Sequence, residues 1–267
     1  MKLLTFVHNG RRGAGILTDR GVAPIEGASD LLEIIQLETL PGPSTTILPL
    51  DEIQPVLPYT PPKIWCIGLN YLSHAEDINA VQPEEPGSFM KPASCMFQPG
   101  GDIVLPPPEI SDDVDAEGEL GVVIGKKCRF VPGDKVQDVI FGYTTTLDLT
   151  ALDVLRKNPR YLTRAKSIDT FFSFGPVIVT ADEIPEVDAL EVITEHNGGV
   201  CSRDFVRHMR TKPYELVRFH SDYMTLYPGD LISTGCPRGA RIKPGDQVRA
   251  RIEGVGTLEA RVTQGTR

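Results

Sequence analysis

The sequence lacks long apolar runs and any pairing of its cysteines. Its 267 residues include five cysteines, at positions 66, 95, 128, 201 and 236, and no two of them form a CxxC pair. Neither a structural zinc site nor a disulfide framework is therefore expected, and a reducing cytoplasmic location is the default. The apolar run at the N-terminus covers only residues 3–7, which is too short for a signal peptide or a membrane span.

An excess of positive charge is also missing. Lys and Arg number 27 against 36 Asp and Glu, which gives a formal net charge of −9. Nucleic acids and anionic membranes are bound through basic surfaces, so we expect neither partner. The chain contains no GxGxxG between a strand and a helix and no GxxxxGK[ST], which argues against a nucleotide site. What is present is an ordinary globular composition, with 40% hydrophobic and 24% charged residues.

Prolines indicate a boundary near the N-terminus. Seven prolines lie between residues 41 and 62, a density that is incompatible with a helix or a central strand. Before them, residues 1–26 read as short strands with a turn at Asn9 and Gly10, and residues 30–40 read as a helix that begins at Asp30. We predict a small N-terminal β/α unit with a Pro-rich linker over residues 1–58 and a main domain over residues 59–267.

The main domain is predicted to be mostly β, with few helices. Residues 63–69, KIWCIGL, read as a buried strand, and residues 247–263 read as a closing hairpin that turns at Gly254-Val255-Gly256. Helices are expected only at about 72–80, 150–157 and 214–224. The expected fold class is therefore mixed α/β and dominated by β-strands.

The stretch DAEGELGVVIG, residues 115–125, places carboxylates at the start of an apolar run. Residues i and i+2 of a strand point to the same face, so Glu117 and Glu119 would project together. Two carboxylates about 4 Å apart repel by roughly 4 kcal/mol at an effective dielectric near 20. They either point into water, or one is protonated, or a cation lies between them. Mg²⁺ and Mn²⁺ prefer such hard oxygen ligands.

Two further residues favour the cation. Asp148 ends a β-rich run at residues 140–146 and precedes a predicted helix that begins at Thr150. Thr150 with Asp153 already forms a suitable helix cap, which leaves Asp148 free for another role. Lys166 follows in RAKSIDTFFSFGP. Three carboxylates and a divalent cation carry one negative charge, which one lysine neutralises.

Seven motifs now carry a family resemblance. KIWCIGLNYLSHAED, FMKPAS, VDAEGELGVVIG, FGYTTTLDLTALD, RAKSIDTFFSFGP, PGDLISTGCP and IEGVGTLEARV occur in the order and spacing of the fumarylacetoacetate hydrolase family. The match covers residues from about 62 to 263. The N-terminal unit also resembles the appendage that many bacterial members carry.

The resemblance implies a β-sandwich roll, usually a homodimer, that binds Mg²⁺ or Mn²⁺ through three carboxylates. At the matching positions the metal ligands are Glu117, Glu119 and Asp148, and Lys166 adds positive charge beside a developing oxyanion. Family members act on 2-oxo and β-diketo acids, including intermediates of aromatic compound catabolism. Asp115 has no counterpart among the ligands and is interpreted as a surface charge.

His74 is the candidate general base. Asp77 lies at i+3 on the same helical face, so spacing favours Asp77 over Glu76 as the residue that orients the imidazole. Ser73 and Glu76 have the spacing of a capping box, which gives Glu76 a structural role. The family usually has Glu at the i+3 position, so this chain is shorter there by one methylene.

Four residues match family positions near the substrate, and each also has a structural interpretation. Lys91 and Tyr71 could equally be a surface lysine and a packed tyrosine. Thr234 and Gly235 match a loop that usually presents backbone donors to the substrate. Cys236 stands where Thr is common, and Leu147 and Leu152 replace polar family residues around Asp148.

The resulting hypothesis is a divalent-metal-dependent hydrolase. It cleaves the C–C bond of an acylpyruvate- or fumarylpyruvate-like β-diketo acid through a metal-bound enolate, with His74 activating water. The alternative within the family is an isomerase or decarboxylase of a 2-oxo or 2-hydroxydienoic acid, such as oxaloacetate or 2-hydroxyhepta-2,4-diene-1,7-dioate. A metal-binding scaffold without catalysis is the alternative from a different class.

Overall fold

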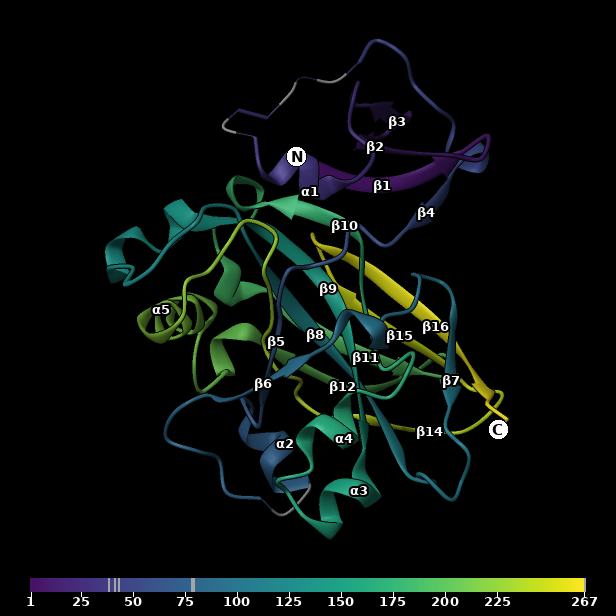
Figure 1. Ribbon diagram of the computed structural model, residues 1–267, viewed down its shortest axis with the longest axis vertical. Coiled ribbons are helices and arrows are strands. Elements are labelled where there is room, and N and C mark those ends of the chain that lie inside the picture. Colours follow the sequence, from purple (N-terminus) through teal and green to yellow (C-terminus); the bar gives the residue numbers. More distant parts are fainter. Residues whose placement is uncertain (38, 41, 43, 78–79, 267) are drawn as a thin grey trace.

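The computed structural model describes residues 1–266 except 38, 41, 43 and 78–79. Two β-sheets pack face to face, with the helices at their edges and ends (Figure 1). The elements of the larger, 11-stranded sheet are β1 (Lys2–His8), β2 (Arg11–Thr18), β3 (Gly21–Pro24), β4 (Gln54–Val56), β5 (Ile64–Gly68), β6 (Gly87–Lys91), β8 (Val114–Ile124), β9 (Ile140–Ala151), β10 (Phe172–Thr180), β13 (Leu231–Ser233) and β14 (Ala240–Ile242).

The smaller sheet has five strands in the order β12-β11-β15-β16-β7. Their bounds are β7 (Asp102–Leu105), β11 (Glu191–His196), β12 (Gly199–Phe205), β15 (Gln247–Ile252) and β16 (Gly256–Gln264). β15 and β16 are the hairpin that alternation predicts at the C-terminal end, and β11 and β15 pack against β8 of the larger sheet. The β-dominated mixed fold and the sandwich are therefore as expected.

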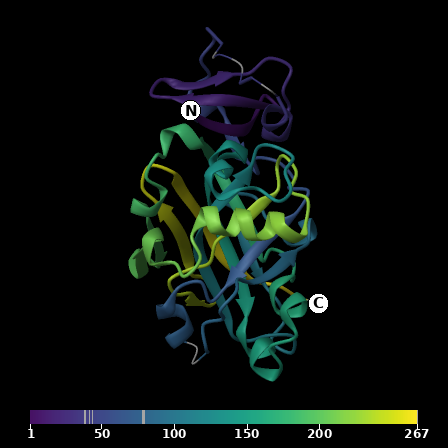
Figure 2. The ribbon, with the colours of Figure 1, turned by 90° about the vertical axis from the view of Figure 1, so that its left-hand side faces the viewer.

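Five short α-helices lie among the described residues. They are α1 (Leu31–Ile35), α2 (Leu72–Asp77), α3 (Leu152–Lys157), α4 (Leu162–Lys166) and α5 (Pro213–Tyr223). Figure 1 shows α2, α3 and α4 together at the end of the molecule opposite the N-terminal strands, and Figure 2 shows α5 in front of the sandwich. No helix among the described residues is long and apolar enough to cross a membrane.

The N-terminal strands extend the larger sheet. Its main order is β3-β2-β1-β10-β9-β8-β13-β5-β6, with β1 hydrogen-bonded to β10 in antiparallel register from Lys2 opposite Val179. β4 lies inside the Pro-rich stretch as an edge strand on β1, a position where Pro55 is tolerated. The division at residues 58 and 59 stays a prediction, because strands from both sides share one sheet.

The helix predictions are partly corrected. β9 continues to Ala151, so Thr150 lies in a strand and α3 begins two residues later than expected. The short helix α4 was not predicted at all. α1 ends at Ile35 rather than near residue 40, and α2 is described to Asp77, with residues 78–79 of the expected helix outside the described residues. α5 agrees with the expected helix at 214–224.

β8 and β9 form the centre of the sandwich. All eleven residues of β8 are buried, including its carboxylates. Gly118 faces the smaller sheet, because a Cβ built on it would lie 2.7 Å from Thr194 Oγ1 and 2.9 Å from Ala250 Cβ. Glu117 and Glu119 therefore project from the opposite face of β8, as period-two alternation predicts.

Candidate active site

Strand register brings the three predicted metal ligands together. Glu117 on β8 is paired directly with Asp148 on β9, and Glu119 is paired with Thr146. Side chains opposite each other in an antiparallel pair have Cβ atoms about 5 Å apart. The ligand oxygens of Glu117, Glu119 and Asp148 all lie within 4.8 Å of one another, and the three residues are at most 4% exposed. The carboxylates thus form a buried cluster rather than a solvated strand end.

Two buried lysines neutralise part of this negative charge. Lys166, at the end of α4, donates to Glu117 Oε2 at 3.0 Å and to Asp148 Oδ2 at 2.8 Å. Lys91, at the end of β6, donates to Asp148 and to the carbonyl of Phe171. Burial lowers the pKa of Lys166, but Asp148 and Glu117 outweigh it and hold that pKa well above its usual value. The lysine therefore remains charged inside the protein.

The two glutamates have different electrostatic environments. Burial acts to raise the pKa of Glu117, but Lys166 and His74 outweigh it and leave that pKa below its usual value. Burial, Asp148 and Glu117 raise the pKa of Glu119 to about 8. Glu119 Oε2 accepts from the hydroxyl of Ser233 and, at 2.9 Å, from the backbone N–H of Gly235. Three carboxylates against two lysines leave the cluster one positive charge short of neutrality.

Thr150 is a site residue that the sequence interpretation placed in the wrong element. Its hydroxyl donates to Glu117 Oε1. This contact exists because β9 continues past Asp148 and turns Thr150 to the same face as Asp148. A threonine two residues after a carboxylate in a strand is the signal that could have identified it.

The donor set fits a divalent cation. Three carboxylates offer hard oxygen ligands within one small volume, as Mg²⁺ and Mn²⁺ require. The lysines and the hydroxyls of Thr150 and Ser233 donate to oxygens of these carboxylates and hold the side chains in place, a support that metal ligands commonly have.

His74 lies on α2 beside the cluster. A ring nitrogen of His74, an oxygen of Glu117 and the sulfur of Cys236 lie within 4.8 Å of one another. His74 is 8% exposed, and its Nδ1 has no hydrogen-bond partner among the described residues. Burial lowers the pKa of His74, although Glu117 acts to raise it. The imidazole is thus a buried, neutral base close to the carboxylate cluster.

The residues around His74 differ from the sequence interpretation. Asp77 Oδ1 pairs with Arg238 Nη2 at 2.9 Å. Ser73 lies inside α2 and donates to the carbonyl of Pro237, so the predicted capping box with Glu76 is not formed. Asp77 and Glu76 are both on α2, and the orientation of His74 by Asp77 stays a prediction.

The position of Asp115 corrects the sequence interpretation. This residue was expected at the surface, but it is fully buried, and its carboxylate pairs with Arg241 Nη1 at 2.8 Å. Gly239 makes room for it, because a Cβ at that position would lie 2.1 Å from Asp115 Oδ2. Burial and Glu117, opposed by Arg241, raise the pKa of Asp115 to about 7.

The four predicted substrate contacts lie around the cluster, and most of their polar groups already have partners. Gly235 N–H donates to Glu119, and the Thr234 hydroxyl donates to the carbonyl of Leu120 at 2.9 Å. Lys91 is buried rather than at the surface. Tyr71 is fully buried, and its hydroxyl has no partner among the described residues. Their contacts with a substrate stay predictions.

A cavity of about 600 Å³ opens onto this cluster, and we call it the α2–α4 pocket. Its reactive side contains His74, Glu117, Thr150, Lys166 and Cys236. Much of the remaining wall comes from α3, α4 and the strands β5 and β6. Elements far apart in the sequence therefore share one pocket.

Comparisons with known proteins agree with this architecture. A family model described as "Fumarylacetoacetate (FAA) hydrolase C-terminal" matches residues 63–263. Human mitochondrial oxaloacetate tautomerase FAHD2B is 36% identical over 222 residues, which cover 79% of this chain and 70% of the tautomerase.

Two solved structures match the chain over its whole length. The 5-carboxymethyl-2-hydroxymuconate delta-isomerase of Mycobacterium smegmatis is 31% identical, with a TM-score of 0.84 and coverage of 100% of both chains. The maleylpyruvate hydrolase of a Sphingobium species, solved with manganese(II) and pyruvate, is 27% identical, with a TM-score of 0.81 and the same coverage. The matched residues include the carboxylate cluster, both buried lysines and His74, and the chain belongs to the fumarylacetoacetate hydrolase family.

Proposed function

We propose that the protein is a divalent-metal-dependent hydrolase that cleaves the C–C bond of an acylpyruvate- or fumarylpyruvate-like β-diketo acid. One observation carries the proposal. The α2–α4 pocket contains the buried imidazole of His74, whose Nδ1 has no hydrogen-bond partner among the described residues, and a ring nitrogen of His74 lies within 4.8 Å of a carboxylate oxygen of the cluster. Hydrolysis of an acylpyruvate needs a Lewis acid that stabilises charge on the substrate oxygens and a base that activates water, both close to the same bound substrate.

Glu117, Glu119 and Asp148 would hold Mg²⁺ or Mn²⁺. When bound, the cation supplies Lewis-acid stabilisation of the negative charge that develops on the substrate oxygens. With Lys91 and Lys166, it would leave the centre with one excess positive charge. An anionic 2-oxo acid neutralises this excess, which favours a carboxylate-bearing substrate.

His74 provides the base. Because burial keeps its imidazole neutral, it can accept a proton from water. The water oxygen then bonds to the acyl carbonyl carbon, and the C–C bond to the pyruvate fragment breaks. The electron pair of that bond stays on the pyruvate fragment as an enolate, which the Lys166 ammonium group stabilises. The imidazolium returns the proton to the enolate carbon that was part of the broken C–C bond, so the products are pyruvate and a carboxylic acid.

A second candidate is a tautomerase, isomerase or decarboxylase of a related 2-oxo acid. The ion pair between Asp77 and Arg238 favours it, because a base without an orienting carboxylate activates water less effectively. The human relative that is named an oxaloacetate tautomerase points the same way. These reactions need the cation and Lys166 but no attack by water.

Product identification separates the two candidates. The purified protein is incubated with acetylpyruvate or with enol-oxaloacetate, each with Mn²⁺ or with EDTA. We expect acetate and pyruvate to form in equal amounts from acetylpyruvate, only when Mn²⁺ is present. Formation of keto-oxaloacetate without any acetate release would instead support the second candidate.

A further inference from the structure

We propose that the α3–α4 side of the α2–α4 pocket is a subsite for an apolar acyl group. The preferred substrate is then a β-diketo acid with an aliphatic or aryl acyl chain, rather than one that ends in a second carboxylate. This inference rests on the proposed function, because it names the substrate class of the same site.

Apolar side chains form the wall opposite the reactive groups. Leu152 and Leu155 from α3, Leu162 from α4, Phe89 from β6 and Pro159 between the helices all line the pocket. Leu155 and Leu162 are only partly buried, so each leaves apolar surface facing the cavity. Covering such surface is favourable by about 25 cal/mol per Å², which gives an alkyl or aryl group a reason to bind there.

The cations of the same pocket are already paired with carboxylates. Arg156 pairs with Asp113, and Arg241 pairs with Asp113 at 3.3 Å and with Asp115 at 2.8 Å. The third lining cation, Lys166, is held by the metal-binding carboxylates. Among the described residues that line the pocket, no cation is left for a distal carboxylate, which would have to displace Asp113.

The volume is also larger than a pyruvate group requires. A cavity of about 600 Å³ lies within the range of roughly 300–1,000 Å³ that encloses drug-sized ligands. An acyl chain of several carbons or a phenyl ring would occupy space that a pyruvate group alone leaves to water.

The test compares kcat/KM for five substrates with Mn²⁺: acetylpyruvate, hexanoylpyruvate, benzoylpyruvate, fumarylpyruvate and oxaloacetate. We expect hexanoylpyruvate or benzoylpyruvate to exceed fumarylpyruvate by at least tenfold. Leu155→Ala with Leu162→Ala should lower the preference for hexanoylpyruvate over acetylpyruvate by about tenfold or more. Acetylpyruvate turnover and the melting temperature of this double variant report on its folding.

Arg156→Gln is the matched control variant on α3, next to Leu155. It should change no kcat/KM by more than about twofold, because Arg156 is paired with Asp113 at a largely exposed position. A preference for fumarylpyruvate or oxaloacetate that Arg156→Gln removes would overturn the inference, since Arg156 would then bind a substrate carboxylate. Equal kcat/KM for acetylpyruvate and hexanoylpyruvate would overturn it as well.

A binding measurement distinguishes failure of the proposed hydrolysis from failure of the apolar subsite. If no acylpyruvate, including acetylpyruvate, is cleaved, the proposed hydrolysis fails, and titration calorimetry of the Mn²⁺-loaded protein then decides the inference. We expect 2-oxooctanoate to bind at least tenfold more tightly than 2-oxoglutarate, and Leu155→Ala with Leu162→Ala to remove this difference. Tighter or equal binding of 2-oxoglutarate would contradict the apolar subsite.

Discussion

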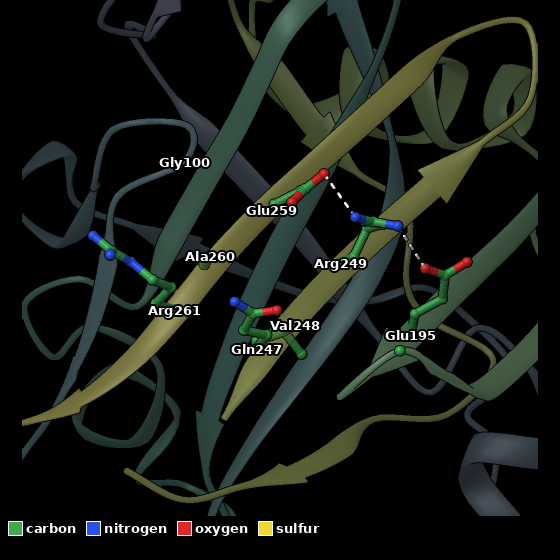
Figure 3. Close-up of a pocket in the computed structure, with 9 residues that line it drawn as sticks. Gly100, Glu195, Gln247, Val248, Arg249, Glu259, Ala260 and Arg261 are labelled. Carbon is green, nitrogen blue, oxygen red and sulfur yellow. Dashed lines mark hydrogen bonds and ion pairs between the residues drawn. The ribbon is translucent and has the colours of Figure 1, made fainter. Parts of the chain in front are cut away.

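Two hollows of the molecule contain many charged residues but differ in how these charges are compensated. In the β15–β16 hollow, lined by Glu195, Arg249, Glu259 and Arg261 among others, Arg249 pairs with Glu259 at 3.0 Å and with Glu195 at 3.3 Å (Figure 3). In the carboxylate cluster, which borders the α2–α4 pocket through Glu117 and Lys166, three buried carboxylates are accompanied by two buried lysines. Exposed, matched charges need no ligand, whereas a buried and unmatched set indicates one.

The largest expected effect is in the buried set. Glu119→Gln removes one of the three proposed metal ligands, so we expect Mn²⁺ affinity, measured by titration calorimetry, to fall at least about 100-fold and turnover to be abolished. Glu259→Gln in the β15–β16 hollow is the matched change and should alter neither quantity. A comparable loss in the Glu259 variant would contradict the contrast between the two hollows.

His74→Asn tests the base separately from the metal. We expect hydrolysis to fall by about 10²–10⁴-fold, because a positioned general base contributes this much, while Mn²⁺ affinity stays within a fewfold of its original value. The readouts are pyruvate release and Mn²⁺ titration on the same sample. Full hydrolysis in this variant would show that His74 is not the base that activates water.

Thr150→Val tests the support behind the ligands. Its hydroxyl holds Glu117 Oε1, and loss of such outer contacts commonly weakens metal binding by about 10- to 100-fold. Thr150→Ser keeps the hydroxyl and should restore most of the affinity. If the valine and serine variants bind Mn²⁺ equally, the hydroxyl has no positioning role.

The smallest effect is expected in the β15–β16 hollow. Arg249→Gln breaks two ion pairs of an arginine that is itself about half exposed to water, so the free energy of unfolding should fall by at most about 1 kcal/mol. Denaturant unfolding measures this change, and Mn²⁺ affinity should remain the same. A loss of several kcal/mol would mean that the pairs contribute more than surface pairs usually do.

Local patterns predicted the strands better than the contacts between them. Period-two alternation places Glu117 and Glu119 on one face, and the structure agrees, because alternation is a property of a single strand. Asp115 was misjudged because its burial depends on Arg241 and Gly239, more than 120 residues later in the chain. No local pattern reports such a partner.

Element ends were the other weakness. Thr150 and Asp153 resemble a helix cap, yet antiparallel pairing with β8 continues through Ala151 and overrides that local preference. α4 has only five residues, too few for a clear helical period, so Lys166 was identified by charge balance and by resemblance rather than by its element. Burial of Lys91 could not be predicted either, because its partners come from β9 and from Phe171.

The division of the α2–α4 pocket between strands and short helices has a practical consequence for redesign. Glu117, Glu119 and Asp148 lie on β8 and β9. The leucines of the apolar wall described above all lie within the continuous segment 152–166. A single exchanged gene cassette for residues 152–165 would replace all of the apolar wall except Phe89 and leave Lys166 and the three proposed carboxylate ligands in place. Libraries of acyl specificity could therefore be built in one cloning step on an unchanged reaction centre.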